Sequence, residues 1–127
     1  MTQTVVVLGS SEVADSVRAA NQFNVLNAES TSAFKGLVQG PLKGVTKANL
    51  VYLIADNLTL DTANLPLERL VDRMSTSGHY VIVLGYTPKA NDLVAAYPAA
   101  GLLRGPFDTN GLLAAIKSKT GWAVTPV

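Results

Sequence analysis

Long apolar runs without polar alternation are the strongest pattern along this chain. Three of them cover residues 4–8, 50–55 and 80–84, and each is closed by a glycine or an aspartate. Such runs are typical of strands buried on both faces of a parallel sheet, because a strand with one wet face would alternate apolar and polar residues. Two shorter runs, residues 23–26 and 101–103, predict two further strands.

An amphipathic stretch follows each of these predicted strands. Ser10 or Ser11, the Ser30–Ser32 cluster and Asp108 are suitable helix caps, and Pro66 is a suitable first helical residue. The spacing of the apolar residues predicts helices whose inner stripes contain Val13, Val17 and Ala20; Phe34, Leu37 and Val38; Leu67, Leu70, Val71 and Met74; Leu93 and Val94; and Leu112, Leu113 and Ile116.

Alternation of buried strands with amphipathic helices predicts an α/β domain. Right-handed crossovers place helices on both faces of the sheet, so we expect a five-stranded, doubly wound parallel sheet of flavodoxin-like strand order 2-1-3-4-5. Residues 1–119 are expected to form this domain. Residues 120–127 show no apolar periodicity and predict an extended tail or the start of a linker, in which Trp122 either anchors a partner or folds back over the last helix.

The composition favours one domain that binds other proteins. Of 127 residues, 48% are apolar and 15% charged, which supplies a core and leaves a surface with few charges. Ten basic and nine acidic residues without a basic run give no reason to expect nucleic acid. The chain has no cysteine, which excludes disulfides and thiolate metal sites. No run is long enough for a signal peptide or a membrane span, so we expect a cytoplasmic protein without membrane insertion.

Candidate chemistry is sought in the loops beyond the carboxyl ends of the strands. The Gly9-Ser10-Ser11 turn is either a helix cap or an anion site, and the cap is favoured because no dinucleotide or P-loop glycine pattern is present. Asp56 ends the third strand, where an aspartate often bonds the following turn. His79 lies before the fourth strand, at the opposite end, and is expected to be structural. Without a second histidine or a carboxylate cluster, no metal site and no enzyme activity are expected.

The order of elements and two motifs resemble the receiver domains of two-component response regulators, from residue 5 to about residue 119. Residues 54–58, Ile-Ala-Asp-Asn-Leu, resemble the third strand that carries the receiver phosphoacceptor, which implies that role for Asp56. Residues 105–108, Gly-Pro-Phe-Asp, resemble the Lys-Pro-Phe turn after the fifth strand.

The chain departs from receivers where phosphoryl transfer needs metal ligands. Transfer to an aspartate requires Mg²⁺ held by carboxylates. Receivers carry an acidic pair after the first strand, whereas this chain has Ser10 and Ser11 there, with Glu12 nearby in the predicted helix.

Two further receiver positions also differ. The serine or threonine after the fourth strand corresponds to Gly85, although Thr87 lies two residues on. The receiver lysine falls on Gly105, with Arg104 beside it and expected to point to the opposite face of the strand.

We interpret the chain as a degenerate receiver that works as a protein-interaction or dimerisation module without phosphorylation and without a cofactor. Similar degenerate receivers lie at the amino end of MinD/ParA-like ATPases (the TadZ/CpaE type) that position pilus or division machinery. The resemblance therefore implies a protein partner, a following domain or a second copy. The pairing face that receivers use would comprise Leu93, Ala96, Tyr97, Leu103 and residues near Lys117.

Two alternatives remain open at this point. One is an active response regulator that is phosphorylated on Asp56, uses Mg²⁺ and has Thr87 and Arg104 as displaced helpers. The other is a flavodoxin-like binder of a nucleotide or flavin at the Gly9-Ser10-Ser11 turn.

Overall fold

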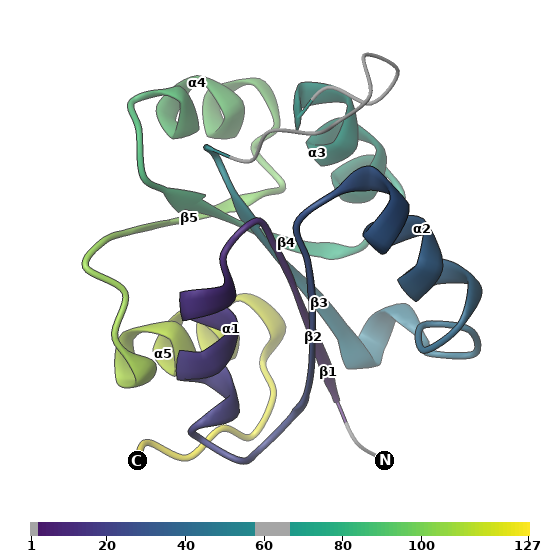
Figure 1. Ribbon diagram of the computed structural model, residues 1–127. Coiled ribbons are helices and arrows are strands. Elements are labelled where there is room, and N and C mark those ends of the chain that lie inside the picture. Colours follow the sequence, from purple (N-terminus) through teal and green to yellow (C-terminus); the bar gives the residue numbers. More distant parts are fainter. Residues whose placement is uncertain (1–2, 58–66) are drawn as a thin grey trace.

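A computed structural model describes residues 3–57 and 67–127. Five parallel strands form one sheet in the order β2-β1-β3-β4-β5 (Figure 1). The sheet has the flavodoxin-like, doubly wound topology that the sequence predicts. The strands are β1 (Thr4–Leu8), β2 (Asn24–Ala28), β3 (Leu50–Ala55), β4 (Tyr80–Gly85) and β5 (Gly101–Arg104).

Helices cover both faces of the sheet. One face carries α1 and α5, and the other carries α2, α3 and α4 (Figure 1). The predicted start of α3 at Pro66 lies outside the described residues. Within the described ranges, none of the helices has the length and apolar character needed to cross a membrane. The helices are α1 (Ser11–Arg18), α2 (Thr31–Gln39), α3 (Leu67–Thr76), α4 (Lys89–Ala96) and α5 (Thr109–Thr120), with a 3-10 turn at Lys47–Asn49.

Two hydrophobic cores result from the alternation of side chains along the strands. In β1, Val5 and Val7 belong to the core under α1 and α5, whereas Val6 and Leu8 belong to the core under α2, α3 and α4. A strand buried on both faces needs apolar residues at every position. The unbroken apolar runs of the sequence therefore reflect the helices on both sides.

Residues after α5 fold back onto the domain. Of the two alternatives left open for Trp122, the structure shows the one in which the ring folds back, since Trp122 is 8% exposed and Val124 is 7% exposed. The Trp122 ring packs against Phe23 and Tyr80, and its Nε1 donates to the carbonyl of Ala48 at 2.9 Å. Two isolated apolar residues show no periodicity, so only the long-range contacts identify them as core. A linker that leads from this segment to a further domain stays a prediction.

His79 lies at the amino end of the sheet and packs edge-on against Tyr52, with ring centroids 5.4 Å apart. Its Nδ1 is buried and has no hydrogen-bond partner among the residues that the structure describes. Burial, and then the positive charge of Lys47, lower the pKa of His79 below its ordinary value. This packing agrees with a structural role.

Replacing Trp122 with alanine should destabilise the fold markedly. Loss of a buried tryptophan costs about 3 kcal/mol, which corresponds to a drop of roughly 10 °C in melting temperature for a domain of this size. Val127→Ala is the matched control in the same segment, because Val127 is 65% exposed. Thermal unfolding followed by circular dichroism measures both variants. Equal melting temperatures for Trp122→Ala and the parent would show that the segment is not part of the core.

Candidate functional site

Asp56 stands at the carboxyl end of β3 and is only 2% exposed. Its carboxylate accepts three hydrogen bonds from the loop after β4. Oδ1 receives the Tyr86 N–H at 2.9 Å, and Oδ2 receives the N–H and the hydroxyl of Thr87 at 2.9 and 2.8 Å. These contacts are with the loop of the neighbouring strand, whereas the expected contact with the turn that directly follows Asp56 falls largely on residues outside the described ranges. Three donors compensate for the water that a buried carboxylate loses.

Thr87 connects this carboxylate to helix α4. While its hydroxyl donates to Asp56, the same oxygen accepts the N–H of Lys89 at 3.2 Å, in the first turn of α4. The Lys89 ammonium in turn lies 3.4 Å from the carboxylate of Glu68 on α3. Thr87 is thus the sequence-predicted neighbour that the structure does bring to Asp56.

Arg104 fills the space that a side chain at position 85 would need. A Cβ built on Gly85 would lie 3.2 Å from Nη1 and 3.3 Å from Cγ of Arg104. The guanidinium donates to the carbonyl of Thr87 at 3.4 Å and to the side chain of Asn91 on α4. Arg104 therefore lies on the α4 side of β5 and contacts the loop that holds Asp56, rather than the carboxylate itself.

Tyr86 connects the loop after β4 to the loop after β1, at the carboxyl end of the sheet, where doubly wound folds bind ligands. Its N–H holds Asp56, and its hydroxyl shares a hydrogen bond with the hydroxyl of Ser10 at 2.9 Å. Its ring packs on Phe107, with centroids 4.9 Å apart. Tyr86 was not among the site residues predicted from the sequence, although an aromatic residue directly after the glycine that ends β4 was the available signal.

The remaining predicted neighbours belong to the start of α1. Ser10 caps the helix by accepting the N–H of Val13 at 3.3 Å, as the helix-cap interpretation predicts. Ser11 and Glu12 lie in the first turn and are exposed. In the described ranges, no group of three or more histidine, cysteine, aspartate or glutamate side chains is arranged to hold a metal ion.

The predicted pairing face does not form one surface. Leu93 is 2% exposed and belongs to the core, and it lines a hollow of about 410 Å³ together with Ala96 and Tyr97. Glu68 also lines this hollow, so it lies between α3 and α4. Leu93 points toward the sheet, which explains why it is not available on the surface.

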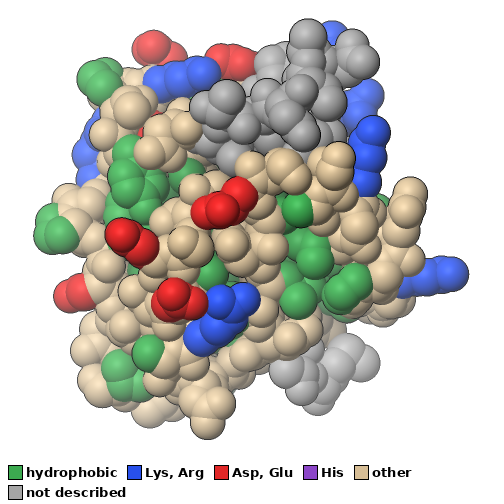
Figure 2. All heavy atoms as spheres, viewed as in Figure 1, with side chains coloured by type: hydrophobic (Ala, Val, Ile, Leu, Met, Phe, Trp, Pro, Cys, Tyr) green, Lys and Arg blue, Asp and Glu red, His purple; other side chains and the backbone are tan. Residues whose placement is uncertain are grey.

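On β5 the outward residue is Leu102 rather than the predicted Leu103. Leu102 is 39% exposed, whereas Leu103 packs against the core under α1 and α5. Adjacent leucines point to opposite faces of a strand, and the sequence does not show which one lies outward. Lys117 is exposed, but it lies beside Val124 and Pro126 on another surface of α5. On the face seen in Figure 2, hydrophobic side chains form separate groups between charged and other polar surface.

Comparisons with known proteins identify no relative. The chain matches no protein-family model and has no significant match among curated proteins or solved structures. The likeness to receivers therefore rests on strand order and on the residues described above.

Asp56→Asn should weaken the fold although the two side chains are nearly the same size. The amide keeps one acceptor oxygen and presents an NH₂ group to donors of the β4–α4 loop, which leaves buried donors unpaired. We expect a loss of about 2 kcal/mol in the free energy of unfolding. Asp92→Asn, on the exposed side of α4, should cost less than about 1 kcal/mol, the scale of a helix-dipole interaction. Urea unfolding measures both, and equal midpoints for the two variants would contradict this assignment of Asp56.

Proposed function

We propose that this domain is a receiver-like protein-interaction and self-association module that works without phosphorylation. Its role would be to regulate or localise a partner protein or a following domain, such as an ATPase of the MinD/ParA kind. The proposal rests on one observation, the burial and hydrogen bonding of Asp56. This residue corresponds to the receiver phosphoacceptor.

A phosphoacceptor carboxylate must offer an oxygen atom to the incoming phosphoryl group. Both Asp56 oxygens are instead bonded to Tyr86 and Thr87, and the side chain is 2% exposed. A phosphoryl donor would have to reach a side chain that is almost fully covered and whose oxygens already share their electron density with three donors, and the reaction would also need Mg²⁺ to neutralise the developing charge. At the end of β1, where receivers hold that metal with carboxylates, Ser10 is engaged with Tyr86.

The position of Tyr86 also supports an interaction role over binding of a flavin or nucleotide. Ligands of doubly wound folds enter the crevice at the point where the strand order reverses. Here the Tyr86 side chain crosses from the loop after β4 to Ser10, and its ring is held by Phe107. A ligand at the Gly9–Ser11 turn would have to displace this side chain.

Self-association is supported by the open edge of β5. Leu102 is exposed on this edge strand, next to a hollow of about 180 Å³ that Ala115, Ser118 and Lys119 of α5 also line. Edge strands with exposed apolar residues are ready sites for pairing with another chain. A symmetric dimer would use this surface twice. Leu102 thus replaces the predicted Leu103 as the central residue of the proposed pairing face.

Incubation with acetyl phosphate and Mg²⁺ tests the first part of the proposal. Intact-mass spectrometry should show no added phosphoryl group, because Asp56 is buried and hydrogen-bonded to three donors. Asp56→Asn, which has no acceptor carboxylate at this position, is the control. A phosphorylated fraction in the parent that disappears in Asp56→Asn would instead establish the active response-regulator alternative.

Leu102→Glu tests the second part. At tens of micromolar, where weak interfaces are detected, the parent should be a dimer by light scattering after size exclusion, and Leu102→Glu should be a monomer. Val38→Glu is the matched control, since Val38 on α2 is also a large exposed hydrophobic residue, at 48%. A monomeric parent, or a dimer that survives Leu102→Glu, would contradict pairing through β5.

A further inference from the structure

Side chains of the domain bind the backbone of residues 122–127, as a protein binds a peptide. The carboxamide of Gln22 accepts the N–H of Thr125 at 2.9 Å and donates to the carbonyl of the same residue. The carboxamide of Asn110 accepts the N–H of Val127 at 2.9 Å and donates to its carbonyl at 3.0 Å. Residues two apart present their backbone groups to the same side of an extended chain. The two carboxamides therefore bind the backbone of this segment along one side.

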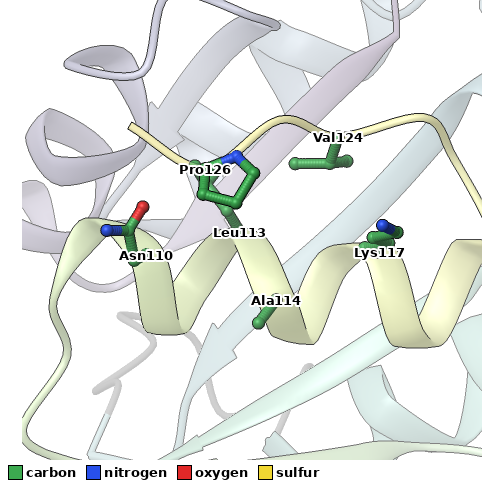
Figure 3. Close-up of a pocket in the computed structure, with 6 residues that line it drawn as sticks. All are labelled: Asn110, Leu113, Ala114, Lys117, Val124 and Pro126. Atoms are coloured by element: carbon green, nitrogen blue, oxygen red, sulfur yellow. The ribbon is translucent and has the colours of Figure 1, made fainter.

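Apolar anchors complete the binding of the segment. Trp122 fits against Phe23 and Tyr80, and Val124 is buried in the core under α1 and α5. Figure 3 shows Val124 and Pro126 lying over α5, near Leu113. The segment forms one wall of a hollow of about 400 Å³, which is lined by Asn110, Leu113, Ala114, Lys117, Val124 and Pro126. We call the surface that binds residues 122–127 the tail site; it includes Gln22, Phe23, Tyr80 and Asn110.

One glycine directs the segment onto the tail site. Gly121 ends α5 with a φ of 76°, a left-handed conformation, and a Cβ built on it would meet no atom within 4 Å. The contacts of the segment described above are non-covalent contacts with residues of the rest of the domain. The same segment of another molecule can make each of them if the chain at Gly121 continues outward instead of turning back.

We propose that the tail site is an exchangeable peptide site, which accepts residues 122–127 of a second copy in place of the chain's own. Reciprocal exchange produces a dimer with Gly121 as the hinge, and domain exchange of this kind needs no new surface. The chain's own segment competes at an effective concentration in the millimolar range. The closed monomer therefore dominates until the turn at Gly121 is weakened. This site is separate from the β5 edge and does not depend on the function proposed for it.

Gly121→Ala tests the exchange. The left-handed turn becomes unfavourable for alanine, whereas the surroundings offer room for the methyl group, so the change acts on the backbone alone. Gly78→Ala is the matched control, because Gly78 has a φ of 84° and equally open surroundings but lies after α3. Both changes are made in the Leu102→Glu background, so that pairing through β5 does not contribute.

Light scattering should show an association constant at least about fivefold higher for the Gly121 variant than for the Gly78 variant. Emission of Trp122, the single tryptophan of the chain, should stay as blue as in the parent, because exchange buries the ring in the second copy. A monomer, a dimer with red-shifted emission, or equal dimerisation of both variants would each overturn the proposal.

A synthetic peptide of residues 121–127 provides a second, independent measurement. In a Gly121→Ala, Trp122→Phe chain the peptide carries the only tryptophan, so its blue shift reports binding. We expect binding in the millimolar range or tighter. Changing Val124 of the peptide to aspartate should weaken it at least about fivefold, because Val124 is 7% exposed and the competing segment of the chain is left unchanged. Absence of a blue shift while circular dichroism shows a folded chain would overturn the proposal.

Discussion

Burying a carboxylate costs several kcal/mol unless hydrogen-bond donors replace the water that it loses, and the carboxyl end of this sheet is arranged around that requirement. Asp56 takes its three donors from the single loop that follows β4. Because the backbone of Tyr86 and Thr87 is fixed in this way, their hydroxyl groups reach Ser10 and the first turn of α4. One buried charge thus connects the loops after β1, β3 and β4.

At the carboxyl end of the sheet, the residues that differ from the receiver pattern fit together. Gly85 leaves the space that the Arg104 side chain occupies, and Arg104 in turn bonds the carbonyl of Thr87. Thr87 then supplies the hydroxyl that binds Asp56. Since a fold can keep its layers while its sites change, such a set of residues is consistent with a receiver-like architecture put to another use.

Local pattern predicted the sheet well. The bounds of β1 and β3 were predicted from apolar runs alone, and Ser10 and Asp108 cap their helices as expected. A helix cap depends on residues that are close in the sequence. A strand that is buried on both faces appears in the sequence as an unbroken apolar run. The strand order followed from the regular alternation of strands and helices.

Features that depend on contacts between distant residues were not predictable in the same way. Trp122 is separated by 74 residues from Ala48, whose carbonyl it binds, and nothing near either residue indicates the contact. Which of Leu102 and Leu103 faces outward depends on the register between β5 and β4. The position of Tyr86 depends on Asp56, whose carboxylate accepts the N–H of Tyr86. In each case the deciding partner lies in another element.

The return of the chain along α5 changes where an attached group would stand. Val127 is bonded to Asn110, in the first turn of α5, instead of lying beyond the last turn. A fluorescent label or fusion protein joined after Val127 would therefore emerge roughly 16 Å from Gly121, at 1.5 Å of helix for each residue between Asn110 and Gly121. Distances measured by energy transfer from such a label would report on the start of α5, and a short fusion linker would bring its cargo next to that turn.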